Sequence, residues 1–329
     1  MNDVKVVIEL SKASPRAGFG MPLIFAGTYI KDVPYTEVGS LAEVKTAGFE
    51  EATAVYKAAQ LLFQQNNAPS KIAVCGSSEA TVTALPNVLH EGWRQLIVIG
   101  GEGDSTVDAI SAYIAGCGEK KLYFASVKSS DSVTVKDATR TVLVVYETTD
   151  VACPEAALVG ATAGMDAGSI TYKNIILKGV TAQDFTDSEV AALHKAGMIT
   201  ILKKAGDIVT SEGIVASGEY IDIMDCQDYI IEQIQYQSQS LMNRVYKLHY
   251  DNRGIAALEG VVVSVLKDAA NQGMIAQIED GDYAYSVTFL PREECADSDI
   301  SARHYTGGSF EFTLAGAIHT AKITGQIIA

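Results

Sequence analysis

The stretch at residues 71–101, KIAVCGSSEATVTALPNVLHEGWRQLIVIGG, contains the pattern that decides the fold. It opens with a short apolar run, IAVCG, and closes with a second one, QLIVIG. The segment between them has helical character and is broken near Pro86. Two buried strands joined by a helical crossover predict a βαβ unit, in which the strands are parallel.

The same alternation continues on both sides of this stretch. Further strands are expected at PLIFAGTY (22–29), KLYFAS (121–126) and VLVVYE (142–147), and helices at 49–65 and 104–117. Short apolar strands that alternate with helices are typical of α/β proteins with both sheet faces covered. The sequence therefore predicts an α/β fold with a mixed, largely parallel sheet and flanking helices, forming a core over residues 21–200.

An α+β portion of the core, with a long helix, is expected over residues 201–298. Before it, residues 153–165 and 186–197 predict helices, the second led by Asp187 or Ser188, with a strand after Gly197. EYIDIMD (219–225) and YAYSVTFLP (283–291) have the composition of strands. Between them, apolar spacing predicts a long helix at about 226–248 and a second one at about 255–272.

Both ends of the chain contain alternating apolar residues, which predict strands that stand apart from the core. We expect an N-terminal strand arm with a hinge at 1–20 and a C-terminal strand arm at 299–329. Glycine tolerates positive φ, so glycines in the adjoining loops are predicted hinges. The arm residues are Val4, Val6, Ile8, Leu10, Phe310, Phe312, Leu314, Ile318, Ile323 and Ile327, and the hinges are Gly18, Gly20, Gly307 and Gly308.

Composition excludes several classes of protein. The net charge of −15 argues against nucleic-acid binding, which needs clustered lysines and arginines. No apolar run is long enough to cross a bilayer, and the mixed-charge start MNDVKVVIELSK does not resemble a secretory signal. We therefore expect a soluble protein made in a cytoplasm, with no membrane contact. Its five scattered cysteines are expected to be free thiols.

A search for catalytic chemistry finds no strong motif. VIGGEGDST (98–106) places Gly101 and Gly103 as in a dinucleotide-binding turn, but Thr106 occupies the position of the third glycine. No nucleophile elbow is present, and the five histidines lack the spacing of a zinc site. The sequence predicts no catalytic residues, no cofactor and no metal, and hence no enzyme.

The C-terminal stretch DISARHYTGGSFEFTLAGAIHTAKITGQI (299–327) closely resembles the end of contractile tail sheath proteins of myophages and phage-tail-like bacteriocins. Asp299, Ala302 and Arg303 match a D-x-x-A-R element, and residues 315–319 match an AGAIH strand. The opening VVIELSKASPRAGFGMPLIFAG (6–27) is also similar to a sheath N-terminus. This chain departs from many sheaths in having Asp225 and Cys226 where basic residues enter the long helix. It also has no room for a large insertion domain.

The resemblance implies a structural subunit that polymerises helically around an inner tail tube and contracts when the baseplate triggers it. Its partners would be copies of itself, the tail tube protein, and baseplate and tail terminator proteins, in a virion or tail-like particle assembled in the bacterial cytoplasm. The terminal arms would pair with neighbouring subunits.

Several alternatives stay open. Lys267 and Asp268 are candidate tube-facing residues, although their helix is equally compatible with core packing and solvated charges. A cytoplasmic nucleotide-dependent α/β enzyme with domain-swapped terminal strands is an alternative function, and another phage structural protein with similar arms is a third. The choice between phage and bacteriocin also stays open.

Overall fold

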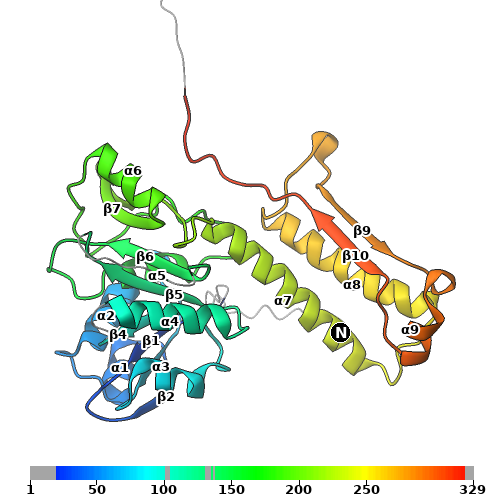
Figure 1. Cartoon of the computed structure of the whole chain (residues 1–329), viewed down its shortest axis with the longest axis horizontal. Helices are drawn as coiled ribbons and strands as arrows, with labels where there is room; N and C mark the ends of the chain where they lie inside the picture. Colours follow the sequence, from blue (N-terminus) through cyan, green and yellow to red (C-terminus); the bar gives the residue numbers. More distant parts are fainter. Residues whose placement is uncertain (1–19, 101–103, 130–134, 136–137, 323–329) are drawn as a thin grey trace, which may run out of the picture.

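The chain forms two lobes connected by one long helix (Figure 1). The computed structural model describes all residues except 1–19, 101–103, 130–134, 136–137 and 323–329. The larger lobe contains the main sheet. The smaller lobe is built around α8 (Asn252–Asn271), and α7 (Ile221–Arg244) runs between the two.

An eight-stranded sheet organises the larger lobe, in the order β2-β3-β1-β4-β5-β6-β7-β8. The six strands from β3 to β7 pair in parallel, and β2 and β8 add antiparallel edges. This confirms the predicted mixed, largely parallel α/β fold. The sheet continues to Thr210, within the segment predicted as the α+β portion of the core. The strands are β1 (Met21–Ala26), β2 (Val33–Val38), β3 (Ile72–Gly76), β4 (Trp93–Ile99), β5 (Leu122–Val127), β6 (Thr141–Val145), β7 (Met198–Lys204) and β8 (Asp207–Thr210).

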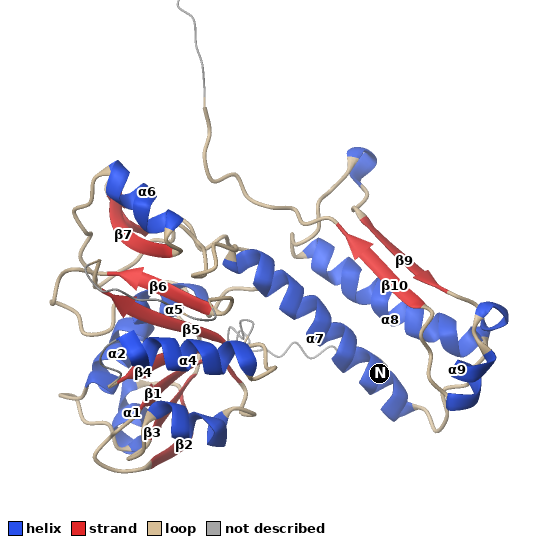
Figure 2. Cartoon of the chain, in the orientation of Figure 1, coloured by secondary structure: helices blue, strands red, loops and turns tan. Residues whose placement is uncertain are grey.

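Helices cover both faces of this sheet (Figure 2). In β1, Ile24 contributes to one hydrophobic cluster and Leu23 and Phe25 to the other, because successive strand residues point to opposite faces. Burial on both faces explains why the strands are apolar runs without a polar side. One layer contains α1 (Leu41–Ala47), α2 (Ala54–Phe63) and α5 (Glu155–Thr162), and the other contains α3 (Thr81–Ala84), η1 (Leu85–Val88), α4 (Asp104–Gly116) and α6 (Asp187–Lys195).

Local sequence signals account for several helix ends. The predicted break near Pro86 is confirmed, because α3 gives way there to the 3₁₀ turn η1. The helix α6 begins at Asp187, one of the two residues predicted to lead it. Thr186 is the N-cap, and it forms a capping box with Glu189.

The prediction of a strand at residues 219–225 is wrong. Ile221 begins α7, which ends at Arg244, whereas the sequence predicted a helix from about 226 to 248. Ile221 and Ile223 flank an aspartate, and this local alternation is typical of a strand. The buried positions Ile221, Asp225 and Asp228 instead follow a helical spacing, and their burial depends on contacts with the larger lobe.

The smaller lobe is a two-stranded antiparallel sheet packed on α8. Its strands are β9 (Tyr285–Phe289) and β10 (Gly308–Phe312), in a register that pairs Phe310 with Val287 and Phe312 with Tyr285. A third hydrophobic cluster joins this sheet to α8 and to Cys226 and Ile230 of α7. The connection between β9 and β10 contains η3 (Arg292–Glu294) and α9 (Asp297–Ala302), and the turn before β9 contains η2 (Glu279–Gly281).

The helix α5 carries a buried carboxyl group, which makes stability depend on pH. Glu155 is 3% exposed, and burial raises its pKa to about 7. The folded chain therefore binds a proton more tightly than the unfolded chain, so stability falls as pH rises from the ordinary value of 4.5 to about 7. The unmodified chain should lose about 2 kcal/mol of stability between about pH 5 and pH 7, and Glu155→Gln should not show this loss. Urea unfolding at both pH values measures this, and an equal pH dependence in the variant would contradict it.

Candidate assembly interface

An ionic network of buried side chains fixes α7 against the larger lobe. Arg94 in β4 is 3% exposed and contacts Asp225 and Asp228, which lie one helical turn apart on α7. Asp228 also accepts two hydrogen bonds from Arg140, at 2.6 and 2.9 Å, and Tyr172 donates one to Asp225 at 2.6 Å. Two carboxylates and two guanidinium groups therefore balance each other. The acidic Asp225, noted as a departure from many sheaths, belongs to this network.

The charges in this network favour the ionised form of Asp228. Burial by itself would raise the pKa of Asp228, but the hydrogen bonds and positive charges of Arg140 and Arg94 lower it below its ordinary value of 3.8. Close packing against Arg94 also explains why residue 20 is a glycine. Gly20 has φ +87°, and a Cβ at this position would lie 2.4 Å from the Cβ of Arg94. Gly20, a predicted hinge, therefore lies directly against the network.

An apolar groove lies between α7 and the outer edge of β10. Its volume is about 570 Å³, and its walls come from one side of α7 and from residues 310–314. Phe310 is 39% exposed there, and its ring stacks on that of Phe312 at 6.3 Å. In the part of the chain that the structure describes, neither β9 nor β10 has a third strand beside it. The groove therefore adjoins a strand edge whose backbone groups are open to pairing. The lining residues are Ile223, Gln227, Ile230, Ile231, Phe310, Phe312, Thr313 and Leu314.

The pairing of β10 corrects the expectation for the C-terminal arm. Phe310 and Phe312 lie in a strand that pairs with β9 of the same chain, and Leu314 forms a bridge with Ile275. Sequence analysis expected this strand to find its pairing in a neighbouring subunit. Within one chain, it already has β9 on one side.

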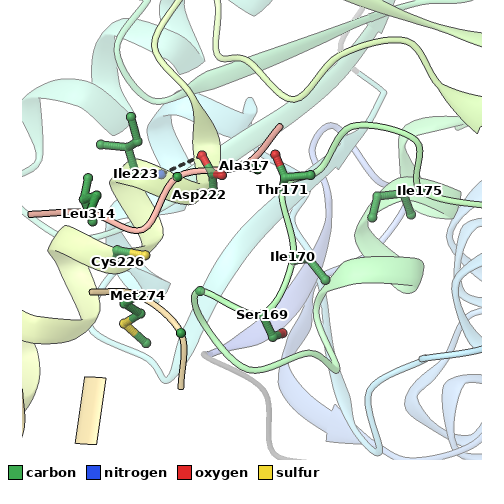
Figure 3. Close-up of a pocket in the computed structure, with 13 residues that line it drawn as sticks. Ser169, Ile170, Thr171, Ile175, Asp222, Ile223, Cys226, Met274, Leu314 and Ala317 are labelled. Atoms are coloured by element: carbon green, nitrogen blue, oxygen red, sulfur yellow. Dashed lines mark hydrogen bonds between the residues drawn. The ribbon is translucent and has the colours of Figure 1, made fainter. Parts of the chain in front are cut away.

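Beyond Leu314 the chain crosses from the smaller lobe to the larger one and then leads away from both (Figure 1). The segment closes one side of an open cavity of about 350 Å³, whose other walls include the loop at 168–175, the start of α7 and Met274 (Figure 3). Ile318 is 90% exposed, whereas the next residue, His319, contacts Thr171, Glu212 and Tyr220 of the larger lobe. The segment is thus anchored at one residue and exposed at its neighbour.

The other predicted site residues are found in different settings. Gly307 and Gly308 are not among the glycines with positive φ; a Cβ on them would lie 2.9 Å from Leu290 and 2.8 Å from the Phe289 ring, respectively. Close packing therefore explains glycine at both positions. Lys267 and Asp268 are exposed on α8. The predicted residues Val4, Val6, Ile8, Leu10, Gly18, Ile323 and Ile327 lie outside the described residues.

Sequence analysis missed two features of the C-terminal segment. Gly316 is its positive-φ glycine, at +64°, where the chain turns from the smaller lobe toward the larger one. Glu212 is a partner of His319, with Oε1 2.7 Å from Nδ1. The AGAIH motif contained the signal for both, namely a glycine among small residues and a histidine after an apolar residue. However, His319 and Glu212 lie more than a hundred residues apart in sequence.

Within the described ranges, no group of three or more His, Cys, Asp and Glu side chains is placed to hold a metal ion. None of the described helices combines the length and apolar character needed to span a membrane.

No protein-family model and no curated protein matches this sequence. Several solved structures are similar to this chain. A chain of the anti-feeding prophage baseplate is 15% identical, with a TM-score of 0.74 and full coverage of both chains. A chain of the anti-feeding prophage helical sheath in its contracted state is 16% identical, with a TM-score of 0.74 over 100% of this chain and 99% of that one. A chain of the contracted sheath complex of PVC, an extracellular contractile injection system, is 12% identical, with a TM-score of 0.70 over 99% and 98%.

These similarities extend over both lobes and the helix between them, and they agree with the resemblance seen at the two ends of the sequence. This chain has the fold of contractile tail sheath proteins.

Proposed function

We propose that this protein is the structural subunit of a contractile tail sheath, which polymerises helically around an inner tail tube and contracts to drive the tube through a target cell envelope. The observation that carries the proposal is the whole-length match to chains of contracted sheaths. The matches give no support to the alternative of a nucleotide-dependent enzyme. The proposed partners are copies of itself, the tail tube protein, and baseplate and tail terminator proteins, in a tail-like particle or virion.

Subunits would be joined by strands added to the β9–β10 sheet. The apolar groove beside β10 combines an open strand edge with a hydrophobic floor from α7, and this combination suits an extended segment with alternating apolar side chains. The N-terminal stretch with Val4, Val6, Ile8 and Leu10 has this pattern. We assign it, from a neighbouring copy, to this groove. The apolar residues Ile323 and Ile327 would extend in the opposite direction, to another copy.

Such joints would tolerate contraction. Backbone hydrogen bonds contribute about 0.5–1.5 kcal/mol each, so a paired strand can stay attached while the rigid lobes exchange one packed interface for another. Exposed apolar side chains on the second half of α7, among them Tyr236 and Met242, supply further contact surface. The extended state would be held by a kinetic barrier. Lys267 and Asp268 remain our candidates for facing the tube, because they are exposed on α8.

Electron microscopy of the purified full-length chain tests the proposed function. We expect negatively stained samples to contain long hollow cylinders, and we expect added tail tube protein to nucleate them. Small globular particles under all conditions, with and without tube protein, would contradict the proposal.

A charge placed in the groove tests the strand joint. Phe310→Asp should leave the monomer folded, because the side chain is already 39% exposed, but should abolish cylinders by placing a carboxylate where an apolar strand must pack. Ser309→Asp is the matched control, since it adds the same charge to the same strand on the opposite face. Circular dichroism checks the fold and microscopy checks assembly. Equal assembly of the two variants would overturn the assignment of the groove.

A further inference from the structure

We infer that His319 is the fixed point of the C-terminal segment: it holds this segment on the larger lobe of its own subunit, so that only the residues after it are free to reach another copy. The anchor itself does not depend on assembly. Its mechanical role in a sheath rests on the function proposed above.

The receiving site is built from three separate parts of the larger lobe. Thr171 comes from the loop at 168–175, Glu212 follows β8, and Tyr220 precedes α7. The imidazole ring packs against the Tyr220 ring edge to face, with centroids 4.9 Å apart and planes at 86°. The His319 side chain is 14% exposed and that of Glu212 is 13% exposed. A side chain held on several sides and largely removed from water is well suited to anchor a segment whose neighbour Ile318 is exposed.

Both ring nitrogens of His319 contact polar groups of the larger lobe. Nδ1 lies 2.7 Å from Glu212 Oε1. Nε2 contacts the Thr171 hydroxyl, which also hydrogen-bonds the Asp222 carboxyl group. The ring is therefore held on two sides, by Glu212 at one nitrogen and by Thr171 at the other.

The site exists whether or not the segment is docked, because Glu212 has a second partner. Lys173 lies 2.6 Å from Glu212 Oε2 and is itself 10% exposed, so the carboxylate is held in place by the larger lobe. His319 then uses the remaining oxygen. A preorganised receptor loses little side-chain freedom when the segment binds, which favours docking.

The anchor sets how far the free end can extend. A pivot at His319 instead of at Gly308 withholds the residues 309–319 from the movable segment, which is about 35–40 Å of fully extended chain. In an assembled sheath, tension on the free end would therefore act first on the contact between His319 and Glu212, and only then on the β9–β10 pair.

Limited trypsin digestion of the full-length monomer tests the anchor. Cleavage after Lys322 requires residues on both sides of the bond to enter the protease, so it reports how often His319 is released. We expect His319→Ala and His319→Gln to raise the cleavage rate about tenfold, because each removes a largely buried polar contact. Glu212→Gln should have a similar effect alone and add little to His319→Ala, since both remove the same contact.

Ile318→Ala is the matched control, because it changes the adjacent exposed side chain, and its cleavage rate should equal that of the unmodified chain. Thermal unfolding of each variant verifies that the fold is intact. A folded His319→Ala variant that is cleaved at the unmodified rate would overturn the anchor, even if the protein forms cylinders. Faster cleavage of that variant in a protein that never forms cylinders would support the anchor and reject the sheath function.

Discussion

Replacing Arg94 with methionine is expected to destabilise the folded chain by about 3–5 kcal/mol, because it leaves the buried Asp225 carboxylate without its counter-charge and Asp228 with one of its two guanidinium partners. Asp225 would keep the hydrogen bond from the Tyr172 hydroxyl, and Asp228 would keep those from Arg140. Guanidinium chloride unfolding followed by circular dichroism measures the loss. An unchanged unfolding midpoint would show that the network contributes nothing to holding α7.

Two further variants separate charge from packing. Arg140→Met should cost less, about 1–2 kcal/mol, because Arg140 is partly exposed and Asp228 keeps Arg94. The triple variant Arg94→Met, Asp225→Asn and Asp228→Asn removes the charges together and should recover part of the stability lost in Arg94→Met. A triple variant less stable than Arg94→Met would argue that packing, not charge, dominates.

The network also predicts sensitivity to acid. The pKa of Asp228 is lowered in the folded chain, so this contribution is present above the ordinary value of 3.8 and is lost as pH falls through the folded value. Glu155 has the opposite sign, because its raised pKa favours the folded chain at low pH. The two groups therefore act in different pH ranges, Asp228 below about pH 4 and Glu155 between about pH 4.5 and 7.

Removing residues 323–329 is expected to abolish cylinders while the monomer stays folded. The truncated chain keeps β10, Leu314 and the His319 anchor, so the hydrophobic cluster of the smaller lobe remains covered. It loses Ile323 and Ile327, which we assign to contacts between copies. Microscopy and thermal unfolding together measure the two outcomes. Regular cylinders from the truncated chain would contradict the assignment.

A longer truncation provides the contrast. Removing residues 310–329 takes away Phe310, Phe312 and Leu314, of which the last two pack against the cluster on α8. We expect this chain to lose stability as well as assembly, since β9 would stand alone on α8 with part of its apolar face uncovered. A stable monomer from the longer truncation would indicate that β10 belongs functionally to the arm.

The organisation of the larger lobe could be predicted from the sequence because its signals are local. Apolar runs of strand length, such as those of β1, β3 and β4, reappear between helical segments, and burial on both faces requires this pattern. The break at Pro86 has an equally local cause. The two ends of the sequence pointed to the sheath fold because they contain short motifs that resemble those of sheath proteins.

Only the tertiary structure decided which distant segments meet. The pairing of β10 with β9, the position of Arg94 beside Asp225 and Asp228, and the docking of His319 on Glu212 each join parts of the chain that share no local pattern. The start of α7 shows the same effect, because its alternation favours a strand while the burial of its aspartates against the larger lobe requires a helix. Periodicity reports how a segment faces a core, whereas the choice of partner depends on charge and shape presented by residues far away in sequence.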